Sequence, residues 1–288
     1  VVIGDRAVGS GSLTGDHNTF IGHYSGYPAT TAVNNTAIGS NSMAAHTTGG
    51  NNVALGYAAL ALNTTGSNNI AIGSYAYDAN TTGANCIAIG RDALSAASGV
   101  VQVVAIGHEA LKVSTASYCT AVGHQSMDAN TTGVANVAVG DGTLGSNTTG
   151  DNGTAVGHFA LNSNTTGSNQ TAVGKNALRA STSSENTAVG SEAGAQLSTG
   201  GDNTIVGYAA GYTTTTAGAN TFIGKSAGYS CNGSDNTYIG QRTAENATTG
   251  TGNIAIGKEA APSSNTASNE CTLGAGNISS LRCNDTSI

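Results

Sequence analysis

A branched aliphatic residue followed by glycine recurs at seventeen regularly spaced positions along this chain of 288 residues, in most cases 17 residues after the previous one. Self-similarity at a short fixed period is the signature of a solenoid, in which every repeat forms one coil and contacts its neighbours. The period therefore predicts about seventeen stacked coils. The glycines of this pattern, called the repeat glycines below, are Gly4, Gly22, Gly39, Gly56, Gly73, Gly90, Gly107, Gly123, Gly140, Gly157, Gly174, Gly190, Gly207, Gly224, Gly240, Gly257 and Gly274.

The residues before each repeat glycine predict a short β-strand. Positions three and one before it are commonly branched aliphatic, as in Ile70 and Ile72, and side chains two apart share one face of a strand. The position between them is usually alanine, as in Ala71, and points to the opposite face. A strand that is apolar on both faces is expected to be buried on both. We therefore expect one face to line the interior of the coil and the alanine face to lie against another copy of the chain.

Two further positions vary together in size. The fourth residue after the repeat glycine is usually large, as in Leu60 and Leu94. In a few coils it shrinks to glycine, as in Gly26, and the residue two before the repeat glycine then grows, as in Phe20. Close-packed interiors tolerate such an exchange only when the total volume is kept. We infer that the two positions share one volume.

The rest of the repeat has the composition of turns. Asn-Thr-Thr-Gly, as in residues 63–66, supplies an asparagine that can bond to its own backbone and a glycine free to take a positive φ. A second asparagine recurs four positions before the repeat glycine, as in Asn52 and Asn69, and is expected to stack as a ladder. The sequence predicts an all-β fold, a parallel β-solenoid (β-roll) with one coil per repeat over residues 1–274, and a transition segment over residues 275–288.

Composition argues against several partners. The formal net charge is −7 and no cluster of Lys and Arg occurs, so we expect no nucleic-acid partner. No stretch approaches the roughly 18 consecutive apolar residues of a membrane span, so we expect no membrane insertion by this segment. The five cysteines lack metal-ligand spacing. We interpret them as small buried thiols, with Cys231 and Cys283 the first candidates for exceptions.

The histidines, carboxylates and potential nucleophiles of the sequence follow no catalytic pattern. Four of the six histidines, His23, His108, His124 and His158, directly follow a repeat glycine, where other coils carry Ser, Tyr, Arg or Lys. Variation among these residue types is typical of a solvated position. The alternative is that one histidine from each chain of an oligomer binds a metal on the symmetry axis. Carboxylates are few and scattered, and no nucleophile has a partner. We expect no enzyme, no catalytic residue, no cofactor and no metal site.

The repeats resemble those of two known groups of proteins. The run Asn35-Thr-Ala-Ile-Gly39, together with the Asn-Thr-Thr-Gly turn, resembles the repeats in the heads of trimeric autotransporter adhesins and in tail-fibre or appendage proteins of phages and large viruses. The final run from Pro262 to Ile288 resembles the segment that, in viral fibres, leads into an endosialidase-type C-terminal intramolecular chaperone. The resemblance implies an intertwined or side-by-side homotrimer, and the chaperone would follow Ile288.

From this resemblance we expect a structural shaft on a virion surface, extracellular and involved in host attachment, with a host surface glycan or protein as receptor. An autotransporter-type bacterial surface adhesin is the alternative. An ice-binding solenoid is a minor one, because paired threonines such as Thr64 and Thr65 point to opposite faces of a strand. Exposed aromatics after the repeat glycine, namely Tyr57, Tyr75 and Phe159, are the candidates for surface recognition.

Overall fold

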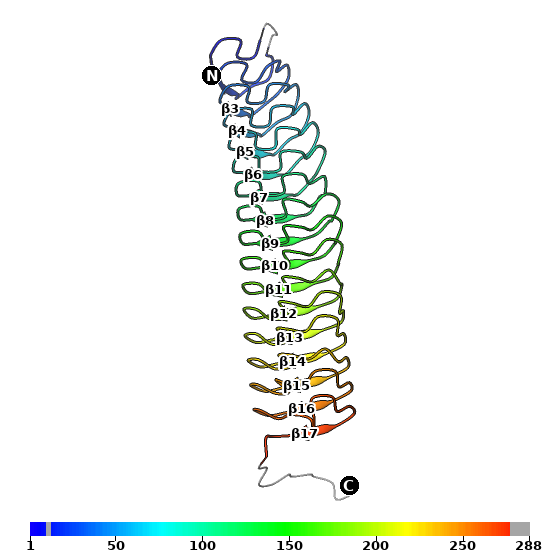
Figure 1. The fold of residues 1–288 in the computed structure, drawn as a ribbon. Helices are drawn as coiled ribbons and strands as arrows, with labels where there is room; N and C mark the ends of the chain where they lie inside the picture. The colour runs from blue at the N-terminus through cyan, green and yellow to red at the C-terminus, as the bar shows by residue number, and fades with distance from the viewer. Residues whose placement is uncertain (10–12, 277–288) are drawn as a thin grey trace, which may run out of the picture. The chain divides into compact units, whose positions relative to one another are not determined.

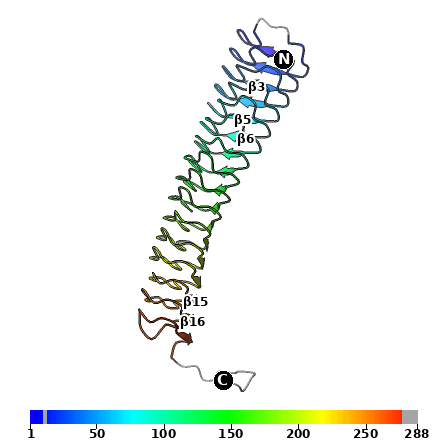
Figure 2. The ribbon, with the colours of Figure 1, turned by 90° about the vertical axis from the view of Figure 1, so that its right-hand side faces the viewer.

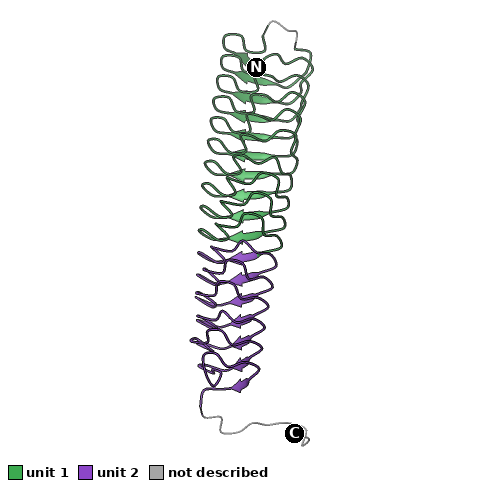
Figure 3. Ribbon diagram, turned by 45° about the vertical axis from the view of Figure 1, so that its right-hand side comes forward, with its two compact units in different colours: residues 1–170 green, residues 171–288 purple. Residues whose placement is uncertain are grey.

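The structure, a computed structural model, describes residues 1–9 and 13–276. The chain divides into two compact units, residues 1–170 and residues 171–288 (Figure 3). In both units the strands are short and their pairings are parallel. Over the described residues no helix has the length and apolarity needed to cross a membrane.

Among its described residues unit 1 contains ten strands, and consecutive strands within the unit pair in parallel (Figure 1). The register is that of the repeat, because Ile70 lies between Val53 and Ile87. The strands are β1 (Val2–Ile3), β2 (Thr19–Ile21), β3 (Thr36–Ile38), β4 (Val53–Leu55), β5 (Ile70–Ile72), β6 (Ile87–Ile89), β7 (Val104–Ile106), β8 (Thr120–Val122), β9 (Val137–Val139) and β10 (Thr154–Val156).

Among its described residues unit 2 repeats the arrangement with seven strands, which lie one beside the next (Figure 2). They are β11 (Thr171–Val173), β12 (Thr187–Val189), β13 (Thr204–Val206), β14 (Thr221–Ile223), β15 (Thr237–Ile239), β16 (Ile254–Ile256) and β17 (Cys271–Leu273). One strand per repeat and parallel pairing confirm the predicted all-β solenoid. The association of chains and residues 277–288, which lie outside the described residues, stay predictions.

The repeat glycine is required by both backbone conformation and space. Gly73 has a φ of +132°, a conformation that residues with a side chain rarely adopt. A Cβ atom added to it would lie 2.5 Å from the carbonyl oxygen of Gly90 in the next coil. The same approach recurs from coil to coil, as at Gly90 and Gly107. Such a glycine therefore lets two coils come into contact, which explains why glycine recurs at this position of the repeat.

The alanine column lies inside the coil, so the expected orientation of the strand is wrong. Ala71 and Ala88 are fully buried, whereas Leu55 is 45% exposed and its branched aliphatic neighbours are half-buried or exposed. The physical reason is the thinness of the coil. Its interior already holds the large residue that lies four positions after the repeat glycine, and only a methyl group fits beside it. The branched residues therefore point outward.

That large residue takes an unusual backbone conformation to reach the interior. Leu60 and Leu94 are fully buried and have φ values of +54° and +55°. A left-handed backbone costs roughly 1–2 kcal/mol for a residue with a Cβ atom. Complete burial of a leucine side chain contributes roughly 1.5–3 kcal/mol. Burial therefore outweighs the local strain, which explains why a residue with poor intrinsic preference recurs here.

The predicted exchange of volume is confirmed. A Cβ atom at Gly26 would lie 2.5 Å from Cδ1 of Phe20, and one at Gly228 would lie 2.7 Å from Cδ1 of Phe222. Both phenylalanines are fully buried. In these two coils the large side chain therefore enters the interior from the position two before the repeat glycine and occupies the space that a side chain four after it would need.

Two buried asparagine ladders join the coils. In the first, which confirms the prediction, the backbone N–H of Asn69 donates to Oδ1 of Asn52 at 2.9 Å, and Nδ2 of Asn52 donates to Oδ1 of Asn35 at 3.1 Å. The second ladder is formed by the Asn-Thr-Thr-Gly turns, where Nδ2 of Asn80 donates to Oδ1 of Asn63 at 2.8 Å. Both of these turn asparagines are fully buried. Their side chains therefore form hydrogen bonds between coils inside the fold and are not accessible for glycosylation in the folded chain.

Candidate functional site

The most extensive unusual surface is an apolar sheet face, here called the aliphatic stripe. In unit 1 it consists of the residues three and one before the repeat glycines of β3–β10, which project outward from each strand. At about 4.8 Å per strand this face is roughly 40 Å long. Contiguous exposed apolar surface of this size marks an interaction site. Its best-exposed members are Ile38, Val53, Leu55, Val137, Val139 and Val156.

Unit 2 carries the same stripe with a different composition. In β11–β15 the position three before the repeat glycine is threonine, whereas the position one before it remains Val or Ile. No charged side chain occurs at these positions in the described strands. A face without charge can be dehydrated at low cost, because no ion has to leave water.

The structure brings together two of the three aromatic residues singled out from the sequence. Tyr57 is 47% exposed and Tyr75 is 42% exposed, and their rings meet edge to face with centroids 5.2 Å apart. A hydrogen bond between the two hydroxyls raises the pKa of Tyr75. Phe159 lies after β10 and contacts His158 with ring centroids 4.0 Å apart. Two of the three residues chosen from the sequence therefore form a contacting pair, and the third is separate.

Another exposed aromatic was missed, although the same rule would have found it. Tyr208 directly follows Gly207 and is 54% exposed, and Nζ of Lys225 lies 5.9 Å from its ring centroid. Two more tyrosines of unit 2, Tyr212 and Tyr229, stack at 5.3 Å. Stacking follows from identical slots in neighbouring coils, so it could be read from the repeat alignment.

The histidines that follow repeat glycines are half-buried or exposed, in keeping with their interpretation as solvated residues. In unit 1 three of them form a column with one carboxylate. The rings of His108 and His124 stack at 5.3 Å, Nδ1 of His124 lies 2.9 Å from Oδ1 of Asp141, and Nε2 of His158 lies 3.4 Å from Oδ2 of Asp141. Because one coil contains 16 or 17 residues, residues separated by that number in the sequence lie next to each other in neighbouring coils.

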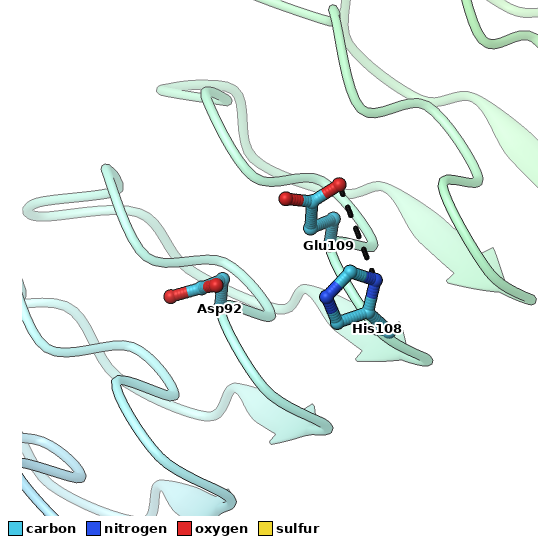
Figure 4. Close-up of side chains that lie close together, drawn as sticks. All are labelled: Asp92, His108 and Glu109. Carbon is cyan, nitrogen blue, oxygen red and sulfur yellow. Dashed lines mark ion pairs between the residues drawn. The ribbon is translucent and has the colours of Figure 1, made fainter.

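At one end of this column, Asp92, His108 and Glu109 gather beyond the ends of two neighbouring strands (Figure 4). Their ligand atoms all lie within 4.8 Å of one another. Glu109 also accepts hydrogen bonds from Lys112 at 2.7 Å and from Gln125 at 2.8 Å, and these bonds lower its pKa to about 2. This group was missed from the sequence because only the position directly after the repeat glycine, where His108 lies, was considered. Asp92 and Glu109 lie one position further along.

The cysteines are mostly buried, as predicted, and burial raises the pKa of the Cys86, Cys119 and Cys231 thiols. The proposed exception at Cys231 is wrong, because this thiol fills the interior of its coil. Cys271 in β17 is the exposed one instead. Cys283 lies outside the described residues.

No protein-family model matches the chain, and no curated protein matches it. The fold itself therefore defines the class: a parallel β-solenoid repeat protein. Its most extensive surface feature among the described residues is the aliphatic stripe.

Proposed function

We propose that this chain is a structural shaft segment of a homotrimeric fibre or appendage on a virion, outside the host cell, and that it serves host attachment. The observation that carries the proposal is the aliphatic stripe. The resemblance of the repeats and of the final run to viral fibres supports the viral setting and the trimeric state.

A second copy of the chain is the partner that fits the stripe best. Every strand of unit 1 offers aliphatic or threonine side chains at the same two positions, spaced by the coil repeat. A parallel copy has the same spacing, so apolar residues meet at every coil without an adjustment of register. Copies related by a closed rotation bury such a patch on all members equally. This arrangement replaces the expected alanine interface with one formed by the branched residues.

The oligomeric state tests this interface directly. We expect sedimentation to give three times the chain mass of 28.1 kDa. Replacing Ile72 and Ile89 with Lys places charges on the stripe in adjacent coils and should yield monomers. Ser74→Lys is the matched control, because the slot after the repeat glycine already carries Lys175 and Lys258. A wild-type chain that is monomeric at micromolar concentration would contradict the interface.

The biological setting needs a separate measurement. Antibodies raised against the purified chain should label the surface of virus particles in immunogold electron microscopy of the organism or virus stock that produces this chain. Labelling of bacterial envelopes in place of particles would support the autotransporter-type adhesin. Tyr57, Tyr75 and Phe159 are the proposed contacts for a host glycan or protein.

An ice-binding solenoid, the minor alternative, has one observation in its favour. The outward face of unit 2 carries a rank of threonines, although these are not the paired threonines of the turns. A face buried in a trimer cannot also contact ice, so the two functions exclude each other. We expect no thermal hysteresis; a clear hysteresis from a monomeric chain would favour ice binding. The threonines are Thr171, Thr187, Thr204, Thr221 and Thr237.

A further inference from the structure

We propose that Asp92, His108 and Glu109 form a binding site for a divalent transition-metal ion of the zinc class. All three side chains belong to one chain and one unit, so the site does not depend on the proposed trimer. Among the residues that the structure describes, they are the one group of three potential ligands whose donor atoms converge.

The coil geometry holds the three donors close to binding distance. Asp92 follows β6, His108 and Glu109 follow β7, and β6 and β7 are paired neighbours. Nδ1 of His108 lies 4.0 Å from Oε2 of Glu109. Zinc binds nitrogen and oxygen at roughly 2.0–2.2 Å, so tetrahedral ligands lie roughly 3.3 Å apart. The donors have to close by about 1 Å, which rotation of half-buried surface side chains can supply.

The donor set selects the class of ion. One imidazole and two carboxylates suit zinc and related divalent ions, whereas calcium and magnesium prefer oxygen ligands alone. Three protein ligands leave a fourth position for water, as in open zinc sites. The thiols of Cys86 and Cys119 are buried in the coil interior and take no part.

Neighbouring side chains orient the two carboxylates. Gln125 holds Oε2 of Glu109 and Lys112 holds Oε1, while Nε of Arg91 lies 3.2 Å from Oδ2 of Asp92. Such outer contacts fix the direction of ligands in metal sites. A carboxylate oxygen has two lone pairs, so Oε2 can accept from Gln125 and still bind a cation.

The electrostatic surroundings favour a cation. Asp78 interacts with Asp92, and Asp128 interacts with Glu109. Among the described residues, four carboxylates therefore lie near this group, and the cations that interact with them are those of Arg91 and Lys112. The negative excess attracts a divalent ion, and the rigid coils prevent the carboxylates from moving far apart to relieve their repulsion.

Zinc titration of the full chain, followed by calorimetry, tests the site. We expect one Zn²⁺ per chain, and Co²⁺ should give the visible absorption of a tetrahedral complex. His108→Ser, Asp92→Asn and Glu109→Gln should each weaken zinc binding at least tenfold. These replacements already occupy the same slots in other coils, as Ser40, Asn41 and Gln125, so the fold should accept them.

His158→Ser is the matched control, because His158 occupies the same slot as His108 and also contacts a carboxylate, Asp141. It should leave zinc affinity unchanged. The proposal is overturned if the wild-type chain binds no zinc at millimolar concentration. It is also overturned if the three site variants bind as the wild type does, or if the control loses as much affinity as they do.

Discussion

The amide Nδ2 of Asn63 lies 3.3 Å from Nδ1 of His46, at the point where the second asparagine ladder meets a histidine. Nε2 of His46 lies 2.9 Å from the carbonyl oxygen of Gly49, which can only accept a hydrogen bond. The ring therefore carries its proton on Nε2 and accepts with Nδ1. A neutral imidazole imitates the asparagine of other coils, and it is fully buried.

This contact predicts a pH dependence of stability. Burial lowers the pKa of His46 below its ordinary value of 6.5, so the unfolded chain binds a proton more readily than the folded one. The ring's contribution is complete above pH 6.5 and is lost as the pH falls below that value. We expect the urea midpoint to decrease between pH 7.5 and pH 5, and His46→Asn to reduce that decrease by continuing the ladder. An equal decrease in both proteins would contradict this role.

The repeat glycine should tolerate no side chain. Gly73→Ala forces a methyl group against the carbonyl of Gly90 and a φ that alanine rarely adopts, so we expect a loss of roughly 3 kcal/mol or more. Ser74→Ala, at the next position, should change the free energy of unfolding by about 0.5 kcal/mol or less. Denaturant unfolding of the two variants measures the difference. A Gly73→Ala chain as stable as the Ser74→Ala control would show that the coils can separate locally.

The sequence was sufficient to predict the strand, the period and the first asparagine ladder because these depend on local pattern. It was not sufficient to orient the strand. Ala71 and Ile72 are both apolar, and which one lies inside depends on how thick the coil is and on where Leu60 and its equivalents enter. The left-handed backbone that directs these leucines inward is contrary to their intrinsic preference, so the pattern of residue types did not reveal it.

The candidate sites illustrate the same limit. Single slots were readable, and Tyr57, Tyr75 and the solvated histidines were found in this way. Contacts between different repeat positions of neighbouring coils could not be predicted, because the distance between two such side chains depends on how far each extends toward the next coil. The approach of Asp92 to His108 is such a contact, since Asp92 lies two positions after its repeat glycine and His108 lies one position after its own.

The shared interior volume predicts compensation between two positions. Phe20→Ala alone should cost roughly 3–5 kcal/mol through the cavity it leaves, and Gly26→Leu alone should clash with the phenylalanine ring. The double variant recreates the ordinary coil, as in Ala54 and Leu60, and should recover much of the lost stability. A double-mutant cycle of unfolding free energies measures the coupling. Additive losses would mean that the two side chains do not compete for one space.

The aromatic pair predicts where surface recognition is located. Exposed tyrosines that are held rigid by a neighbour supply most of the affinity in many interfaces, so Tyr57→Ser with Tyr75→Ser should reduce binding on a glycan microarray at least tenfold. Serine occupies the slot of Tyr57 in other coils, as in Ser40 and Ser74, and the slot of Tyr75 at Ser226. Tyr208→Ser is the control, because Tyr208 is similarly exposed and occupies the same slot as Tyr57 but belongs to unit 2 and is not among the proposed contacts. An equal loss in the control would show that exposed tyrosines outside the pair contribute as much to recognition, and unchanged binding in the double variant would exclude the tyrosine pair.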